Sequence, residues 1–135
     1  MKLFSRSWKR SEKPSKQRKY IENAPLHIKR IFFNATLSKE LRKKYKRRSF
    51  PVKKGDTVKV LVGDFKNKIG KINGTDRKRI KIYIDGIEKG RKDGTKVFIA
   101  IKPNNVMIQE LNLDDKLRRR AIERNSSSDK KGGVK

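Results

Sequence analysis

Hydrophobic and polar residues alternate along the middle of the chain. Val58, Val60 and Val62 are separated by Lys59 and Leu61, and this period of two is typical of a half-buried strand. Four later runs of aliphatic residues predict further strands that bury the same kind of side chain: residues 69–72, 80–84, 97–101 and 106–108. We therefore expect the apolar residues from Val58 to Ile108 to form one core.

Glycine turns separate these runs. Asn73-Gly74 closes the second run, Asp85-Gly86 follows the third, and Asp93-Gly94 precedes the fourth. Aspartate and asparagine followed by glycine tolerate positive φ, so Asp85-Gly86 in particular predicts a hairpin turn. Short strands joined by tight turns predict a mainly β module that curls into a small barrel.

The segment before this module has helical spacing. Pro25 is suited to a first helical position, and apolar residues follow it as far as Phe33 at three- and four-residue spacing. Ser38 predicts the N-cap of a second short helix. One face of that helix is predicted to hold Leu37, Leu41 and Tyr45. Residues 1–22 have almost no periodic apolar positions, so we expect them to be extended until a partner orders them.

A C-terminal helix is predicted after the last strand. Asp114 or Asp115 is suited to cap it, and the pattern ends near Arg124. Leu117 and Ala121 face inward in this prediction, and Arg118, Arg119 and Arg120 face outward. Residues 125–135 lack core-forming side chains and are expected to be disordered. The chain then divides into a basic arm with two short helices (1–51), a barrel (52–111), and a C-terminal helix with a flexible basic tail (112–135).

Composition narrows the classes of function. The 135 residues include 40 Lys and Arg against 14 Asp and Glu, a formal net charge of +26, and such a chain needs a polyanion to offset its self-repulsion. With no cysteine and one histidine, disulfides and thiolate zinc sites are excluded, and we expect no cofactor. Residues 1–10 lack the apolar stretch of a signal peptide, and no run is long enough for a membrane span. A nucleic-acid binder fits best.

The positive charge is uneven along the chain. Residues 1–51 carry a net charge of +14, residues 52–110 of +8 and residues 111–135 of +4. Six of the seven residues 42–48 are cationic, which favours contact with phosphate over the alternative of a solvated helix face. The cations between residues 9 and 19 are consistent with an arm threaded through RNA and also with a nuclear-import signal. The two interpretations are compatible with each other.

Residues 55–72 carry the most informative motif. This stretch, GDTVKVLVGDFKNKIGKI, resembles the KOW motif of nucleic-acid-associated proteins. Two strands are linked by a loop, and the glycines of the motif, Gly55, Gly63 and Gly70, are predicted to be turn residues that allow positive φ or close backbone approach. Asn67 stands where the motif usually has glycine, and asparagine is the next best residue for a left-handed conformation. The alternative interpretation is a basic hairpin in an unrelated barrel.

Segments on both sides of the motif resemble a single family in the same order. They are residues 23–30, 37–42 and 48–51 before it, and residues 93–97 and 101–106 after it. Together with the motif they are similar to the universal large-subunit ribosomal protein number twenty-four, called number twenty-six in eukaryotes. The N-terminal arm favours the eukaryotic and archaeal branch of that family. The short KOW loop and the short C-terminal tail depart from many members.

The resemblance implies a structural role without catalysis. It implies an SH3-like barrel bound to ribosomal RNA near the 5′ domain of the large-subunit RNA, beside the polypeptide exit tunnel, and a part in early subunit assembly. It also implies neighbouring ribosomal proteins as partners, with nascent-chain factors at the tunnel exit as a further class. The location would be the cytoplasmic ribosome, with assembly in the nucleolus in a eukaryote.

We expect exposed cations of the arm and the barrel to bind this RNA. The candidates, with His27 as either a contact or a plain surface residue, are Lys9, Arg10, Lys13, Lys16, Arg18, Lys19, His27, Lys29, Arg30, Lys39, Arg42, Lys43, Lys46, Arg47, Arg48, Lys53, Lys54, Lys66, Lys68 and Lys71. Phe4, Trp8 and Tyr20 are suited to stack on unpaired bases or lie at random in the arm.

Two other functions compete with this one. A KOW-containing transcription or RNA-processing factor has the same motif but generally pairs it with a polymerase-binding domain, for which 135 residues leave no room. A nuclease needs paired carboxylates or a nucleophile with its base, and only Asp56 and Asp64 offer a starting point for that idea.

Overall fold

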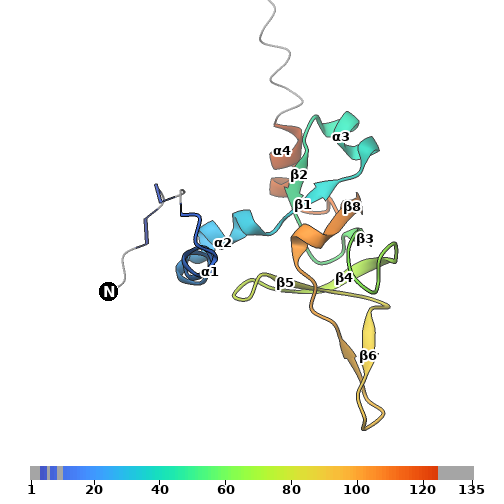
Figure 1. The fold of residues 1–135 in the computed structure, drawn as a ribbon. Coiled ribbons are helices and arrows are strands. Elements are labelled where there is room, and N and C mark those ends of the chain that lie inside the picture. The colour runs from blue at the N-terminus through green and yellow to red at the C-terminus, as the bar shows by residue number, and fades with distance from the viewer. Residues whose placement is uncertain (1–3, 6, 9–10, 125–135) are drawn as a thin grey trace, which may run out of the picture.

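A curled β-sheet forms the centre of the protein. The computed structural model describes residues 4–5, 7–8 and 11–124, and within them one sheet has six strands in the order β2-β1-β8-β3-β4-β5 (Figure 1). Its strands are β1 (Asn34–Leu37), β2 (Ser49–Pro51), β3 (Thr57–Val60), β4 (Ile69–Asp76), β5 (Lys81–Ile84) and β8 (Val106–Glu110). All neighbours are antiparallel except β1 and β8, which run parallel.

The far edge of the sheet bends back toward its middle. Ile82 in β5 exchanges backbone hydrogen bonds of 2.8 and 3.0 Å with Ile101. The 3₁₀ helix η1 (Pro103–Asn105) then leads directly into β8. This return path is compatible with a small barrel, and the aliphatic side chains at 58, 60, 72, 82, 84, 106 and 108 are all buried inside it.

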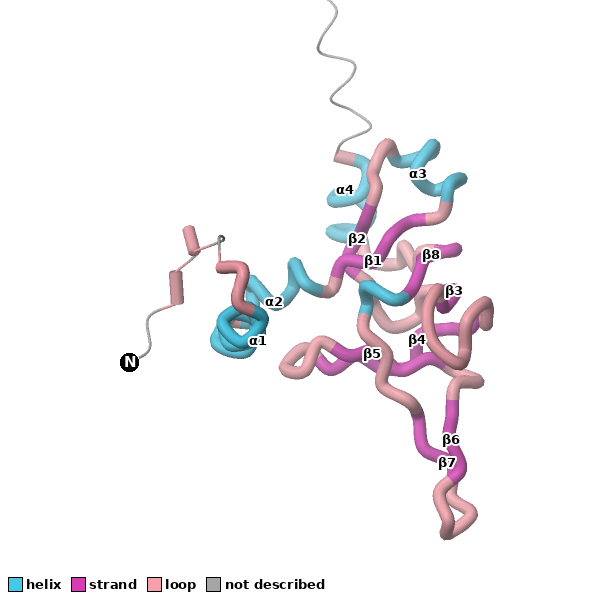
Figure 2. Tube along the Cα trace, viewed as in Figure 1, coloured by secondary structure: helices cyan, strands magenta, loops and turns pink. Residues whose placement is uncertain are grey.

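Two strands leave this sheet. β6 (Glu88–Gly90) and β7 (Lys96–Phe98) pair only with each other and project from the six-stranded sheet as a separate hairpin (Figure 2). Asp93-Gly94 turns this hairpin, as predicted, with Gly94 at φ 78°. The prediction that Val97 lies in the core is wrong, because it is 37% exposed and the projecting pair has no second layer against it.

Three details of the predicted strands are also wrong. Asn73-Gly74 does not turn the chain, because β4 continues through it and absorbs the extra residue as a bulge opposite β5. Asp85-Gly86 makes a turn, but the strands on either side of it pair with other partners. Val62 and Ile69 are 62% and 57% exposed, since the loop after β3 carries both out of the core.

Helices flank the sheet in the described part of the chain. The first, α1 (Pro14–Asn23), contradicts the expectation of an extended arm, since Pro14 opens it and its residues form a regular helix. The second, α2 (Leu26–Phe32), and α3 (Lys39–Tyr45) match the two predicted helices. As predicted, the Ser38 hydroxyl accepts a hydrogen bond from the Leu41 N–H at 3.3 Å. The fourth helix is α4 (Lys116–Glu123). Helices and strands contain similar numbers of the described residues, so the fold is mixed rather than mainly β.

The sheet extends into the segment predicted as the arm. β1 and β2 precede residue 52, and β1 lies against β8 from the far end of the chain. The helical prediction for Leu37 is wrong, because this residue lies in β1 with its side chain fully buried. The sequence analysis did not predict these short strands: β1 pairs with β8, about 70 residues away, and β2 pairs with β1.

The helix α4 packs on the sheet with a face that differs from the predicted one. Asp115 caps it by accepting the Leu117 N–H at 2.9 Å, as predicted. Ile122 is fully buried, but Leu117 is 73% exposed and Arg118 is 8% exposed. The predicted orientations of Leu117 and Arg118 are therefore wrong: Leu117 faces solvent and Arg118 faces the core. The reason is the buried ion pair of Arg118, which fixes the rotation of the helix.

Candidate nucleic-acid interface

The loop between β3 and β4 presents the lysines of the KOW-like motif. The Val60 N–H donates to the Lys68 carbonyl at 2.9 Å, and the Asn67 N–H donates to the Val60 carbonyl at 2.8 Å, so the loop closes on its own backbone. Asn67 has φ 69°, which confirms the expected left-handed conformation. Lys66 and Lys68 are exposed, and the Lys68 ammonium lies 5.0 Å from the centroid of the Phe65 ring.

Glycine is required on the strand that follows this loop. A Cβ on Gly70 would lie 2.5 Å from the Asp85 carbonyl oxygen and 2.7 Å from Cγ2 of Ile84. The absence of a side chain at Gly70 therefore lets β4 approach the end of β5 closely, and the next residue, Lys71, is exposed. The other two glycines of the motif, Gly55 and Gly63, have positive φ of 94° and 99°.

Two more candidate lysines lie in the connection from β2 to β3. Lys53 and Lys54 are exposed, and the Lys53 ammonium lies 3.3 Å from Oδ2 of Asp115. Hydrogen bonds from the backbone N–H groups of Leu117 and Arg118, and then from Lys53, hold the pKa of Asp115 below its ordinary value. The Asp115 carboxylate is therefore held by the N-terminus of α4 and by Lys53.

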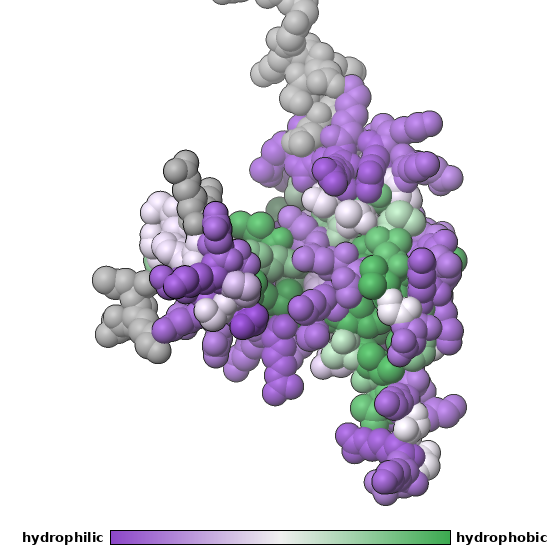
Figure 3. Space-filling model, in the orientation of Figure 1, coloured by the Kyte–Doolittle hydropathy of each residue, from purple (hydrophilic) through white to green (hydrophobic). Residues whose placement is uncertain are grey.

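The basic run in and after α3 is divided between structure and solvent. Nε of Arg42 donates to the Leu37 carbonyl at 2.8 Å, and the Arg47 guanidinium lies 5.8 Å from the centroid of the Phe50 ring. The exposed cations of this run are Lys39, Lys43, Lys44, Lys46 and Arg48. In the view of Figure 3, hydrophilic side chains cover the α3 end of the molecule and the tip of the β6–β7 hairpin.

The helices α1 and α2 carry the remaining candidates. Lys13, Lys16, Arg18, Lys19, His27 and Arg30 are exposed, whereas Lys9 and Arg10 lie outside the described residues. The aromatic side chains near α1 contact one another, since the Tyr20 ring centroid lies 4.7 Å from that of Phe4 and 5.2 Å from that of Trp8. Exposed cations thus run along both helices.

The tertiary structure adds a basic turn that the sequence analysis did not select. Arg77, Lys78 and Arg79 form the exposed turn between β4 and β5, and Oδ1 of Asp76 accepts hydrogen bonds from the last two backbone N–H groups at 3.0 and 3.1 Å. This turn reaches α2, because the Lys29 ammonium donates to the Lys78 carbonyl at 3.3 Å. Three consecutive cations were the available signal, but the contact with α2 joins positions 49 apart.

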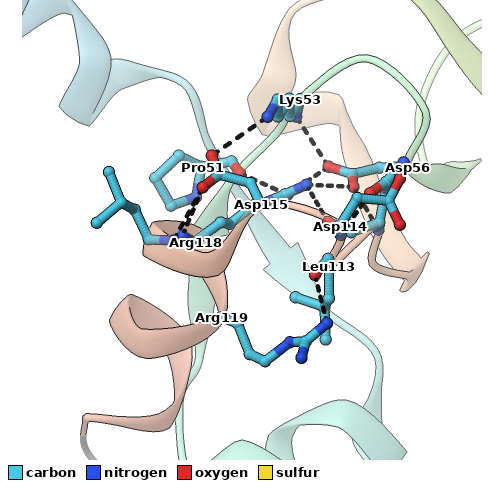
Figure 4. Close-up of polar contacts among 10 residues, drawn as sticks. Pro51, Lys53, Asp56, Leu113, Asp114, Asp115, Arg118 and Arg119 are labelled. Atoms are coloured by element: carbon cyan, nitrogen blue, oxygen red, sulfur yellow. Dashed lines mark hydrogen bonds and ion pairs between the residues drawn. The ribbon is translucent and has the colours of Figure 1, made fainter.

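The carboxylates do not gather into a centre. In residues 4–5, 7–8 and 11–124 no group of three His, Cys, Asp or Glu side chains is placed to hold a metal ion, and no helix there has the length and apolarity to span a membrane. Asp56, one of the two acids that a nuclease would need, is fully buried and bound by Arg118 (Figure 4). Its carboxylate is part of the fold's packing.

Comparison with known proteins identifies the family. The model of the family described as the eukaryotic ribosomal proteins L26 and their archaeal counterparts matches residues 11–125. The chain belongs to this family. The match confirms the resemblance on which the sequence analysis relied, including its eukaryotic and archaeal branch.

Three archaeal relatives agree over most of their length. Each is named large ribosomal subunit protein uL24. The protein of Methanothrix thermoacetophila is 50% identical over 114 residues, 84% of this chain and 98% of that protein. The protein of Korarchaeum cryptofilum is 46% identical over 115 residues, 85% of this chain and 88% of that protein. The protein of Methanosphaera stadtmanae is 40% identical over 114 residues, 84% of this chain and 97% of that protein.

Proposed function

We propose that this protein is a structural constituent of the large ribosomal subunit that binds ribosomal RNA and catalyses no reaction. The family match over residues 11–125 carries this proposal. The net charge of +26 supports it, because phosphate groups of RNA supply the negative charge that the chain lacks. The exposed cations described above then serve as phosphate contacts, which fix the position of a protein on folded RNA.

The barrel and the N-terminal arm have different parts in this proposal. An SH3-like KOW barrel places Lys53, Lys54, Lys66, Lys68 and Lys71 against the RNA backbone. The arm, with its helices, lays further cations across neighbouring RNA segments. The three-part division at residues 51 and 111 describes these roles, while the sheet itself joins the first two parts through β1 and β2.

The proposed position is near the 5′ domain of the large-subunit RNA, beside the exit tunnel. A protein that binds there would enter the subunit early in its assembly, which in a eukaryote takes place in the nucleolus. Neighbouring ribosomal proteins would be its protein partners, and nascent-chain factors a further class. The unpaired and irregular parts of the RNA supply the specificity, because side chains cannot easily enter the deep major groove of A-form RNA.

The loop lysines provide the direct test. Lys66, Lys68 and Lys71 are replaced together by alanine, and binding to a transcript of the 5′ domain is measured at several salt concentrations. The matched control replaces Lys89, Lys92 and Lys96 of the projecting hairpin, which removes the same charge from another exposed site. We expect the loop variant to bind more weakly and to lower the steepness of the salt dependence by about 2–3, since each of the three lost phosphate contacts removes about 0.7–0.9.

Equal losses in the loop variant and the hairpin variant would mean that the RNA responds only to total charge. Unchanged affinity of the loop variant would exclude the loop from the interface. Sedimentation separates the proposal from the rival transcription or processing factor. Migration with large subunits through moderate salt supports a ribosomal constituent, and purification with RNA polymerase instead would favour the rival.

A further inference from the structure

A cleft opens where α2, α4 and the β4–β5 turn meet. Its volume is about 400 Å³, within the range of ligand sites in proteins. Arg30 of α2, Lys53 of the β2–β3 connection and Arg77 of the β4–β5 turn are among the residues that line it. Segments that are far apart in the sequence therefore form it, and only the folded chain contains it.

The cations of this cleft fall into two kinds. Arg118 and Lys53 already have acidic partners, since Arg118 binds Asp56 at 2.6 Å and Lys53 lies 3.3 Å from Asp115. The side chains of Arg30 and Arg77 are exposed, and neither has a hydrogen-bond or ion-pair partner among the described residues. The cleft therefore has two guanidinium groups whose donors are open to a ligand.

The same cleft has an apolar wall. Leu117 lines it and is 73% exposed, the largest exposed fraction among the large hydrophobic residues that the structure describes. Ala121 and the edges of the buried Phe33 and Val52 continue this wall. Because Arg118 turns inward to Asp56, α4 is rotated so that Leu117 must face outward. The fold thus places an uncovered aliphatic side chain in the same cleft as two arginines whose side chains have no partner among the described residues.

We propose that this cleft holds one unpaired nucleotide of RNA, with its base against Leu117 and its flanking phosphates on Arg30 and Arg77. A guanidinium matches the oxygens of a phosphate with two parallel hydrogen bonds. Bases that have left the helical stack are the usual targets of specific RNA recognition, because their faces and edges are accessible. This inference rests on the proposed function. It adds a contact that recognises an unpaired nucleotide in addition to the phosphate charge.

An acidic protein segment is the main rival occupant. A segment with carboxylates would also bind the arginines, and Asp115 on the rim of the cleft, which is paired with Lys53, does not discriminate between a carboxylate and a phosphate. Phosphate is favoured because the chain as a whole needs a polyanion. The following experiment separates the two occupants.

Three variants distinguish the parts of the site on a transcript of the 5′ domain. Arg77→Ala should weaken binding about tenfold and lower the steepness of the salt dependence by about 0.7–0.9, the share of one phosphate. Arg77→Lys should keep the salt dependence but still weaken binding several-fold, because a lysine cannot form the paired hydrogen bonds. Leu117→Ala should weaken binding by about 3- to 10-fold with an unchanged salt dependence, because it removes only an apolar contact.

Matched controls lie elsewhere on the surface. Arg91→Ala removes an exposed arginine from the projecting hairpin, and Val97→Ala shortens an aliphatic side chain that is 37% exposed on the same hairpin. Both should bind within about twofold of the wild type. All the substituted positions are exposed, so each variant should unfold at the wild-type temperature.

A photoreactive residue identifies the occupant in assembled large subunits. Leu117→p-benzoylphenylalanine should crosslink to RNA at an unpaired nucleotide, and a crosslink to protein alone would overturn the inference. It also fails if Arg77→Ala and Leu117→Ala bind like the wild type while the triple loop variant binds weakly, a result that leaves the proposed function intact. If the wild type itself does not bind the transcript, both the proposed function and this inference fail.

Discussion

Arg118 in α4 forms a buried, two-pronged ion pair with Asp56, which lies 62 residues earlier in the chain, just before β3 (Figure 4). The two guanidinium nitrogens lie 2.7 and 2.6 Å from the two carboxylate oxygens. The Arg118 guanidinium also donates to the carbonyls of Asn112 and Pro51, at 2.8 and 3.1 Å. One side chain therefore joins the C-terminal helix to β2 and to the entry of the KOW-like hairpin.

Breaking this pair should destabilise the protein more than any exposed charge does. Arg118→Met leaves a buried carboxylate without its cation, which costs about 3–5 kcal/mol. Asp56→Ala should cost at least as much, because the backbone N–H groups of Lys53 and Asn112, at 2.8 and 2.9 Å, also lose their acceptor. The free energy of unfolding in urea measures both effects. Arg120→Met on the exposed side of α4 is the control and should change stability by less than about 0.5 kcal/mol.

The close approach of β4 to the end of β5 predicts that two glycine-to-alanine substitutions on β4 differ in their effect on stability. Gly70→Ala forces a Cβ to within 2.5 Å of the Asp85 carbonyl oxygen, so the strand must shift, at a cost of about 1–3 kcal/mol. Gly74→Ala on the same strand meets only the Tyr83 ring, at 3.5 Å, and should be close to neutral. Thermal unfolding of the two variants provides the comparison. Equal midpoints would show that β4 tolerates a side chain at position 70.

The cap of α4 predicts a dependence of stability on pH. Hydrogen bonds from the Leu117 and Arg118 N–H groups, and then from Lys53, lower the pKa of Asp115 in the folded state below 3.8, its ordinary value. A lowered pKa contributes stability that is fully present above pH 3.8 and is lost as the pH falls through the folded-state value. Asp115→Asn keeps an oxygen at the cap but removes the charge. Its stability should lie below that of the wild type at neutral pH, and the two should converge in acid.

Binding to ribosomal RNA should depend steeply on salt. If about 10 of the cations contact phosphates, the logarithm of the affinity should fall with the logarithm of the salt concentration with a slope of about −7 to −9. Titration of the wild type with the 5′-domain transcript between about 50 and 200 mM salt measures this slope. A slope near about −2 would mean that only a few of the exposed cations meet the RNA.

Local signals in the sequence identified the features that depend on neighbouring residues. The caps at Ser38 and Asp115 and the left-handed Asn67 were predicted because each depends on backbone groups within a few positions. The strands β1 and β2 were missed for the opposite reason. β1 is stabilised by its parallel pairing with β8, and the sequence of a four-residue strand does not indicate which distant strand will pair with it.

The candidate interface divides in the same way. The cationic arm, the KOW-like loop and the family were accessible from charge, spacing and motif order. Arg118 was assigned to the solvent because a run of arginines in a short helix ordinarily faces water, and nothing near it indicated that Asp56 would be buried opposite. The turn at Arg77 was passed over because its contact with α2 exists only after folding.

The sequence by itself determined that the chain binds a polyanion and which family it belongs to, because net charge and the order of the motifs are properties of the sequence and do not depend on the fold. Tertiary structure alone decided which cations remain free to bind and which are used inside the protein. Burial makes that decision: a charge removed from water must be paired, and the partner is supplied by whichever segment the fold brings beside it.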